Sequence, residues 1–225
     1  HRARVRQSTG GHNPAHCRFR TQLNLEKSGK TIEHTEEILT LKKVSLKHPL
    51  LRFSYILKDV SLSLHKGEIL GVYGLMGAGR TELMEYIFGL HPKNSSGEVI
   101  VRGKCCKIKT PADAIASGIA LVPEDRKLHG LILNQNIQSN ISLTVLKQIE
   151  NWGFLLSKKK EKTLSINYIS RLAIKTSSDK NLAKNLSGGN QQKIVLAKWL
   201  ATNPQILLLD EPTRGIDINA KAEIY

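Results

Sequence analysis

The sequence predicts an α/β fold, and two stretches carry that prediction. An apolar run over residues 68–73 leads into a glycine-rich loop, GVYGLMGAGRT over residues 71–81, and a helix-forming segment over 81–87 leaves it. A second apolar run, residues 206–209, has no polar face and ends in two acids. A strand that is apolar on both sides is expected in the middle of a parallel sheet covered by helices.

The glycine-rich loop has the spacing of a phosphate-binding P-loop. Its glycines let successive backbone N–H groups face inward and hold phosphate oxygens, and the N-terminus of the following helix adds its own N–H groups. Arg80 stands where the pattern G-x-x-x-x-G-K-[ST] has lysine, and a planar guanidinium is not equivalent to an ammonium at a tight phosphate site. Taken alone, the loop also fits a chance glycine-rich turn. The residues expected to contact a nucleotide here are Gly74, Leu75, Met76, Gly77, Ala78, Gly79, Arg80, Thr81 and Glu82.

A length of 225 residues suits one sizeable domain, or one domain with a flexible appendage. The hydrophobic content of 40% is enough for a packed core. No run approaches the roughly 20 apolar residues of a membrane span. The N-terminal residues lack the apolar stretch of a secretory signal, so none is expected. Cys17, Cys105 and Cys106 match neither a zinc spacing nor a disulfide framework, which favours reduced thiols in a cytosolic protein.

The formal net charge of +15 is concentrated toward the N-terminus. Residues 1–30 contain seven of the 34 Lys and Arg residues and one of the 19 acids. Such a balance fits attraction to RNA or to an anionic membrane, and it fits a solvated surface equally well. No aromatic-interleaved basic patch or recognised nucleic-acid module accompanies it, so no nucleic-acid partner is expected.

The order of elements indicates three regions. Residues 1–35 are basic and without periodicity, and we expect a disordered tail or linker. Residues 36–225 are expected to form the nucleotide-binding domain, with an antiparallel β subdomain near its start and an inserted helical subdomain over about 131–180. A short helix is predicted to begin after Thr110, which can cap it together with Asp113. Strands are expected over residues 38–44, 56–64, 97–101 and 119–122.

Two further motifs follow the helical region. In the stretch LSGGNQQ, residues 186–192, Ser187 can cap a helix whose glycines leave backbone N–H groups open to phosphate. Taken alone, this could be only a helix N-cap. Asp210, at the end of the apolar strand, is the acid expected to hold Mg²⁺ beside the phosphates, together with the Thr81 hydroxyl. Glu211 could polarise the attacking water, and the two acids are the expected catalytic residues.

These motifs together resemble those of ATP-binding cassette (ABC) proteins. GLMGAGRT, LSGGNQQ and ILLLDEP occur in the family's order, and residues 213–217, TRGID, look like its D-loop. Residues 123–127, PEDRK, place Glu124 where most cassettes have a glutamine. The variant motifs closely resemble the monosaccharide-import ATPases of the ribose, xylose and galactoside type, in which one polypeptide carries two cassettes. The similarity is to the second cassette and covers about residues 37–225.

The resemblance implies a P-loop NTPase core of ABC type that binds ATP and Mg²⁺ and works facing a partner cassette, either the tandem first cassette or a second copy. Its own site would be impaired by Arg80, while its signature would complete the partner's site. Glu124 and the helical subdomain would face membrane permease subunits, with a periplasmic sugar-binding protein as an indirect partner. The expected location is the cytoplasmic face of the plasma (inner) membrane. The signature residues with this implied role are Ser187, Gly188, Gly189 and Gln191.

Several features depart from the family pattern. Residues 1–35 match nothing in it, the first cassette is absent, and the last strand and switch histidine of a cassette are expected to be missing. Phe53 and Tyr55 are candidates for stacking on adenine, and core aromatics are the alternative. A catalytically silent cassette, a fragment without its own function, and a soluble ABC ATPase acting on nucleic acid remain as alternatives. The last ranks lowest because residues 125–186 hold no sustained heptads.

Overall fold

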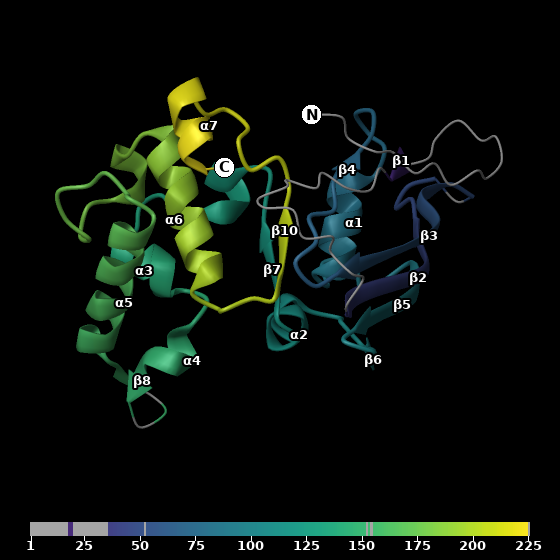
Figure 1. Ribbon diagram of the computed structural model, residues 1–225, viewed down its shortest axis with the longest axis horizontal. Helices are drawn as coiled ribbons and strands as arrows, with labels where there is room; N and C mark the ends of the chain where they lie inside the picture. Colours follow the sequence, from purple (N-terminus) through teal and green to yellow (C-terminus); the bar gives the residue numbers. More distant parts are fainter. Residues whose placement is uncertain (1–17, 20–35, 52, 152, 154, 225) are drawn as a thin grey trace, which may run out of the picture. The chain divides into compact units, whose positions relative to one another are not determined.

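The computed structural model describes residues 18–19, 36–51, 53–151, 153 and 155–224 (Figure 1). The chain forms two compact units, one ending at Ser117 and the other beginning at Gly118, and each is described by itself. The tail expected over residues 1–35 lies outside the described residues apart from Arg18 and Phe19.

The first unit is built on an antiparallel sheet of four strands in the order β3-β2-β5-β6, which is the expected antiparallel subdomain. The three predicted strands of this region are present, and each extends beyond its predicted bounds. Alternating apolar residues give the sheet one buried face, since successive side chains of a strand point to opposite sides. The strands are β2 (Glu37–Lys47), β3 (Tyr55–His65), β5 (Ser95–Val101) and β6 (Lys104–Cys106).

Two of the described helices belong to this unit. Helix α1 (Arg80–Ile87) buries Leu83, which is 1% exposed, and Ile87. Helix α2 (Pro111–Ala116) has the predicted capping box: Thr110 Oγ1 accepts from the Asp113 N–H at 3.3 Å, and Asp113 Oδ2 accepts from the Thr110 N–H at 2.9 Å. The hydrogen bond from the Thr110 hydroxyl contributes most to lowering the pKa of Asp113. The predicted start of this helix is confirmed.

The strand that feeds the glycine loop is shorter than predicted. Instead of residues 68–73, strand β4 comprises Val72–Tyr73 alone and pairs antiparallel with β1 (Arg18–Phe19). A strand is defined by its hydrogen-bonded partner, and among the described residues this partner is only two residues long. Apolar composition alone could not set this length.

The second unit contains the parallel pair β7 (Ile119–Val122) and β10 (Ile206–Leu209), in register from Ile119 with Ile206 to Val122 with Leu209. All of β7 is buried, as predicted. The predicted strand over residues 206–209 and its parallel pairing are confirmed, but the expectation that both of its faces are buried is wrong, because Leu207 and Leu209 are 36% and 41% exposed. Within the described residues β10 has one strand neighbour, so one side of it is not enclosed in a sheet.

The rest of the second unit is mainly helical, and α6 lies at its centre with α3 and α7 packed against it (Figure 1). The segment expected to be the helical subdomain, residues 131–180, contains α3, α4, the hairpin β8–β9 and α5. The elements are η1 (Arg126–Gly130, a π-helix), α3 (Ile137–Ser142), α4 (Leu146–Ile149), β8 (Glu150–Asn151), β9 (Leu155–Leu156), α5 (Lys158–Arg171), η2 (Ala183–Asn185, a 3₁₀ helix), α6 (Gly188–Leu200) and α7 (Ile218–Ile224).

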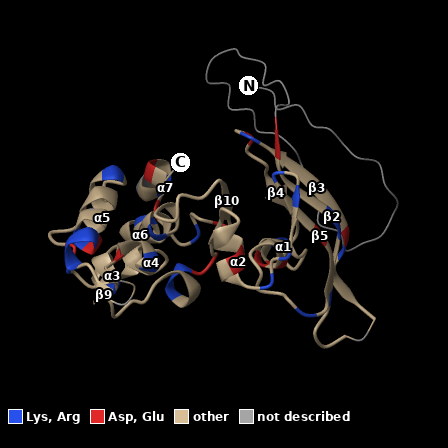
Figure 2. Cartoon of the chain, turned by 90° about the horizontal axis from the view of Figure 1, so that it is seen from below, with Lys and Arg blue, Asp and Glu red and all other residues tan. Residues whose placement is uncertain are grey.

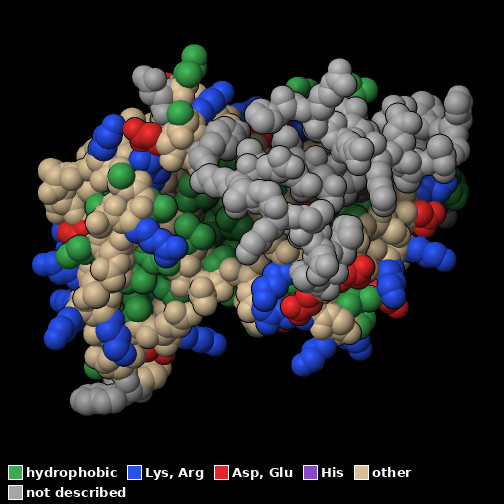
Figure 3. All heavy atoms as spheres, viewed as in Figure 1, with side chains coloured by type: hydrophobic (Ala, Val, Ile, Leu, Met, Phe, Trp, Pro, Cys, Tyr) green, Lys and Arg blue, Asp and Glu red, His purple; other side chains and the backbone are tan. Residues whose placement is uncertain are grey.

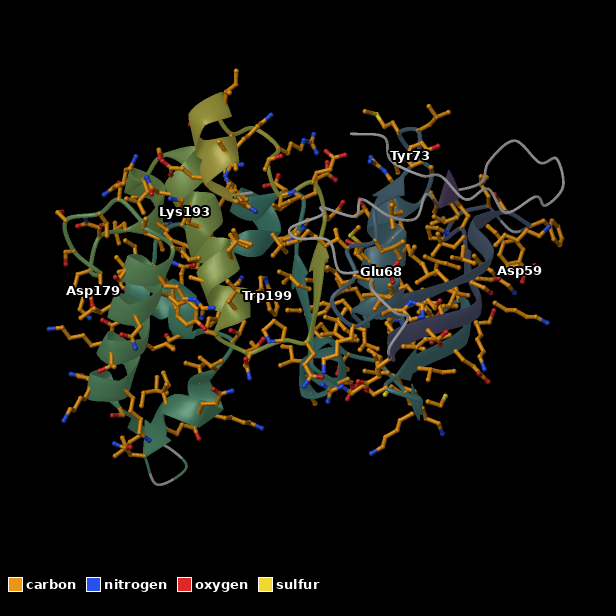
Figure 4. The ribbon with its side chains drawn as sticks, viewed as in Figure 1. Asp59, Glu68, Tyr73, Asp179, Lys193 and Trp199 are labelled. Carbon is orange, nitrogen blue, oxygen red and sulfur yellow. The ribbon has the colours of Figure 1, made fainter. Side chains whose placement is uncertain are left out.

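Two lysines of α6 are buried, and each holds a neighbouring segment. Lys193 Nζ donates to Glu223 Oε2 of α7 at 2.7 Å and to the Ala173 carbonyl at 3.1 Å (Figure 4 labels Lys193). Lys198 Nζ donates to the Gly130 carbonyl and lies 5.1 Å from the centre of the Trp199 ring. Burial lowers the pKa of Lys198 to about 8. A buried charge is costly unless it is paired or hydrogen-bonded, and these contacts meet that requirement.

The antiparallel sheet depends on a close approach at Gly97. Its φ is +110°, and a Cβ there would lie 2.6 Å from Val44 Cα and 2.8 Å from the Lys43 carbonyl oxygen. We expect Gly97→Ala to lower the free energy of unfolding by more than about 3 kcal/mol, because the contacted atoms are backbone and cannot move aside. Gly103→Ala is the control, since Gly103 also has positive φ (+72°) but has nothing within 4 Å. Gly103→Ala should lower the free energy of unfolding by only about 1–2 kcal/mol. Urea unfolding of both variants measures the difference, and equal losses would contradict the steric explanation.

Candidate functional site

The glycine loop of the first unit presents its apex to solvent. A hydrogen bond from the Ala78 N–H to the Leu75 carbonyl, 3.0 Å long, closes the turn. Leu75 is 86% exposed and Met76 is fully exposed. No apolar contact holds these two side chains in a core, so this geometry leaves the apex free to lie against a ligand.

Two glycines of the loop adopt backbone angles that favour glycine. Gly77 has φ +80° and Gly79 has φ +84°, both in the left-handed region. A Cβ on Gly79 would come within 2.9 Å of Leu57 Cδ2 and 3.0 Å of the Ile56 carbonyl oxygen. The end of the loop therefore rests directly on β3, which fixes where α1 begins.

Helix α1 begins at Arg80, one residue before the predicted start, with Gly79 as its N-cap. The side chain of Arg80 runs back along the loop: its Cγ and Cδ lie 3.8 Å from where a Cβ of Gly74 would stand. Thr81 and Glu82 follow in the first turn, where unpaired N–H groups and the positive end of the helix dipole favour an anion. The structure thus places the predicted residues 74–82 in one loop and one helix turn.

The two predicted acids lie at the carboxyl end of β10 in the second unit. Asp210 is 5% exposed, and its N–H donates to the Val122 carbonyl at 3.0 Å, which extends the pairing with β7 by one step. Glu211 is exposed and has φ +40°. A left-handed conformation is uncommon for a residue with a Cβ and is found preferentially at functional sites.

Ser187 caps α6 as predicted. Its Oγ accepts hydrogen bonds from the Asn190 N–H at 3.5 Å and from Asn190 Nδ2 at 2.9 Å. Gly189 is buried, and a Cβ there would lie 2.5 Å from the Cβ of Ala220 in α7. Gly188 lies against Arg126 and the Gly215 carbonyl oxygen. Close packing against α7 therefore requires glycine at 189, whereas at 188 a side chain would displace only the end of Arg126.

Gln191 is turned inward. It is 5% exposed, and its Nε2 donates to the Ala183 carbonyl at 3.1 Å. Its expected role in completing a partner's site would need the amide at the surface, and the structure does not place it there. The helix period explains the difference, because Gln191 and Val195, four residues apart, share the buried face of α6.

Arg126 is a site residue that sequence reasoning left out. Its Nη1 donates to the Arg214 carbonyl at 2.8 Å and its Nη2 to the Gly215 carbonyl at 3.2 Å. Arg214 in turn forms an ion pair with Glu124. The segment after β7 therefore holds the segment after β10 and touches the start of α6. The PEDRK motif indicated that this segment mattered, but it did not indicate a contact 88 residues away.

Asp125 fixes the segment that carries Arg126. Its Oδ1 accepts from the Leu128 N–H at 3.0 Å and from the Lys127 N–H at 2.8 Å, so it caps the π-helix η1. These backbone donors, Leu128 first, hold the pKa of Asp125 below its usual value. The Asp125 carboxylate thereby orders the backbone of residues 125–128, next to Arg126.

The adenine-stacking candidates lie at the tip between β2 and β3. Phe53 is 91% exposed and Tyr55 is 44% exposed. The alternative that they are core aromatics is therefore wrong. Neither side chain needs to leave a core to meet a ligand.

Comparison with solved structures identifies the class of fold. The chain shares its fold with an ATP-binding cassette, MJ0796, solved as a dimer bound to ADP and Pi, at a TM-score of 0.68 and 22% identity, over 83% of this chain and 79% of that one. A nucleotide-free cassette from an ABC transporter gives a TM-score of 0.68 at 20% identity, over 84% of this chain and 74% of that one. The predicted α/β fold of ABC type is confirmed.

The sequence model of the ABC transporter family matches residues 57–214, and the chain belongs to this family. It is 48% identical over 198 residues to the ribose import ATP-binding protein RbsA of Rhodopirellula baltica, covering 88% of this chain and 39% of that protein. It is 46% identical over 190 residues to the xylose import ATP-binding protein XylG of Yersinia pseudotuberculosis, covering 84% and 37%. The chain thus spans well under half the length of these relatives. The resemblance to monosaccharide-import ATPases is confirmed.

None of the described helices is both long enough and apolar enough to cross a bilayer.

We expect Arg126→Ala to loosen the three segments that meet at its guanidinium. Charge-assisted hydrogen bonds contribute about 1.5–3 kcal/mol, so unfolding of the second unit should become easier by roughly that amount. Hydrogen exchange should become faster in residues 187–192 and 214–217. Lys127→Ala is the matched control, because Lys127 is exposed and only its backbone N–H is used. Unchanged exchange in both segments would show that Arg126 does not hold them.

Proposed function

We propose that this chain is an ATP-binding cassette of a monosaccharide importer. It would couple ATP binding and hydrolysis to sugar uptake through membrane permease subunits, at the cytoplasmic face of the inner membrane. The observation that carries the proposal is the exposed glycine loop that ends on the N-terminus of α1, which is a ready anion site. The similarity to ribose and xylose import ATP-binding proteins supports the sugar class.

The nucleotide would be held by the backbone N–H groups of residues 74–80 and the first turn of α1. Thr81 and Asp210 offer a hydroxyl and a carboxylate, which are the oxygen ligands that Mg²⁺ takes in phosphate sites. The low exposure of Asp210 suits a carboxylate that acts on a metal rather than on bulk water. Bound Mg²⁺ would neutralise phosphate charge, and Glu211 would orient and polarise the attacking water.

A second role would be to serve a partner cassette. Ser187 is exposed at the start of α6, so it could meet a nucleotide held by the facing cassette, as the tandem arrangement of the family implies. This chain would then act as the second cassette of the pair. Glu124 and residues 131–180 would meet the permease, which in turn meets a periplasmic sugar-binding protein.

A catalytically silent cassette is the second candidate, and Arg80 favours it. The aliphatic stem of Arg80 lies along the loop beside Gly74 and carries a bulkier guanidinium, where the family pattern has a compact ammonium. Such a cassette would activate its partner while turning over little ATP of its own. The two candidates differ in whether this chain hydrolyses ATP at its own site, and low turnover with intact activation of the partner would identify the silent cassette.

Thermal unfolding with and without Mg-ATP tests the proposal. A ligand that binds only the folded state raises the melting temperature, so an upward shift is expected for the natural chain. Arg80→Lys should enlarge the shift, because a lysine restores the compact charge; a gain of roughly tenfold in affinity is expected. Lys66→Arg serves as a control for an exposed Lys/Arg exchange outside the loop. A shift that is absent in both the natural chain and Arg80→Lys would count against nucleotide binding.

Ser187→Arg should block hydrolysis at the site of a lysine-containing partner cassette. A long cation at the N-terminus of α6 would occupy the space where the partner's phosphates must lie. Steady-state phosphate release by the reconstituted pair should fall by about 100-fold, the size of effect seen when one transition-state donor is removed. Ser170→Arg is the control, since Ser170 is an exposed serine of α5 in the same unit. Full activity of the Ser187 variant would refute the partner role.

A further inference from the structure

One end of the second unit carries exposed leucines beside exposed lysines. Leu155 and Leu156 form strand β9 and are 53% and 48% exposed. After Ser157 come the first turns of α5, where four lysines are exposed: Lys158, Lys159, Lys160 and Lys162. We call this surface the hairpin patch and define it as Leu155, Leu156, Lys158, Lys159 and Lys162.

The fold keeps the hairpin patch together. The Ser157 N–H donates to the Ile149 carbonyl at 2.9 Å, and Lys160 Nζ donates to the Glu150 carbonyl at 3.1 Å. The start of α5 is thereby tied to the end of α4 and to β8. Strand β9, which carries the leucines, pairs with β8, so β8 links the leucines to the lysines of α5.

The acid of this segment points away from the patch. Glu161 Oε2 accepts from Gln138 Nε2 at 2.6 Å, and its Oε1 accepts from Ser142 Oγ at 2.8 Å, so its carboxylate is held against α3. The side chains that reach solvent from the first turns of α5 are therefore basic. Figure 2 shows the Lys and Arg positions of α5 in blue, and Figure 3 shows basic side chains standing along the outer side of this unit.

The lysines are placed where helix stability disfavours them. The N-terminus of a helix carries a partial positive charge, which stabilises acids and destabilises cations in the first turn. Lys158 and Lys159 occupy that turn, and Ser157 caps it. The described residues give these two ammonium groups no hydrogen bond or ion pair. A sequence that breaks a local rule without a gain in folding often does so for a function.

We propose that the hairpin patch binds an anionic lipid surface. Lysine ammonium groups attract phosphate headgroups, while exposed leucines can enter the boundary between headgroups and acyl chains. RNA fits less well, because lysines would attract its phosphates but the exposed aliphatic leucines would gain nothing from a phosphate backbone. This contact is separate from nucleotide chemistry, and the patch lies within residues 131–180, the region that the proposed function places at the membrane permease.

The test is co-sedimentation of the full chain with vesicles in the absence of nucleotide. One set of vesicles contains phosphatidylcholine alone, and the other contains about a third of phosphatidylglycerol, which supplies the anionic surface. The natural chain should bind the anionic vesicles and not the neutral ones, and added salt should weaken the binding by screening. Since no ATP is used, failure here leaves the nucleotide proposal intact, and a missing ATP shift leaves this test intact.

Two variants locate the contact. K158E/K159E should weaken binding at least tenfold, since each lysine near an anionic surface contributes roughly fivefold. It should remain folded, because glutamates suit the first turn of α5. K104E/K107E is the matched control: it changes the net charge equally, at exposed lysines of the first unit, and should weaken binding several-fold less. High salt screens the attraction of the lysines, so the binding that remains depends on the leucines. L155S/L156S should weaken this remaining binding.

Three results would overturn the proposal. Equal losses in K158E/K159E and K104E/K107E would mean that net charge alone, including the basic residues 1–30, attracts the chain to lipid. Equal binding to neutral vesicles would remove the role of the lysines. Binding of a single-stranded RNA that is lost in K158E/K159E, with no binding of anionic vesicles, would assign the patch to nucleic acid instead.

Discussion

The parallel pairing of β7 with β10 is the constraint on which the second unit depends. In this pairing Val122 lies opposite Leu209. The Asp210 N–H extends the pairing by one hydrogen bond, which it donates to the Val122 carbonyl. Because parallel strands end at the same edge, the segments that follow them leave side by side. Arg126 can therefore reach the backbone of residues 214–215, although these positions are far apart in sequence. A one-residue slip would separate these partners.

The features predicted correctly depend on residues close in sequence. Thr110 and Asp113 form the capping box, and Ser187 caps α6, because each needs only partners within one helix turn. Helix α1 begins within one residue of its predicted start, next to Gly79, whose left-handed backbone favours glycine. In the same way, the family motifs are short and contiguous, so one sequence suffices to recognise them.

The features that were missed depend on distant partners. The exposed side of β10 reflects its number of strand neighbours, which apolar composition does not reveal. The inward turn of Gln191 follows from which face of α6 meets the 3₁₀ helix η2. Nothing in the sequence indicates that two lysines of α6 are buried, because their burial depends on the carbonyls and the Glu223 carboxylate that surround them. The nucleotide-binding and catalytic roles of the site residues in the two units remain predictions.

Strand β6 has a consequence for the behaviour of the chain in concentrated solution. It is one edge of the four-stranded sheet, where unpaired backbone groups can recruit a strand from another molecule. The strand is only three residues long, begins with the exposed Lys104 and is followed by Lys107. A short edge flanked by like charges is a poor template for intermolecular pairing. This side of the sheet is thereby protected against the growth of β-aggregates.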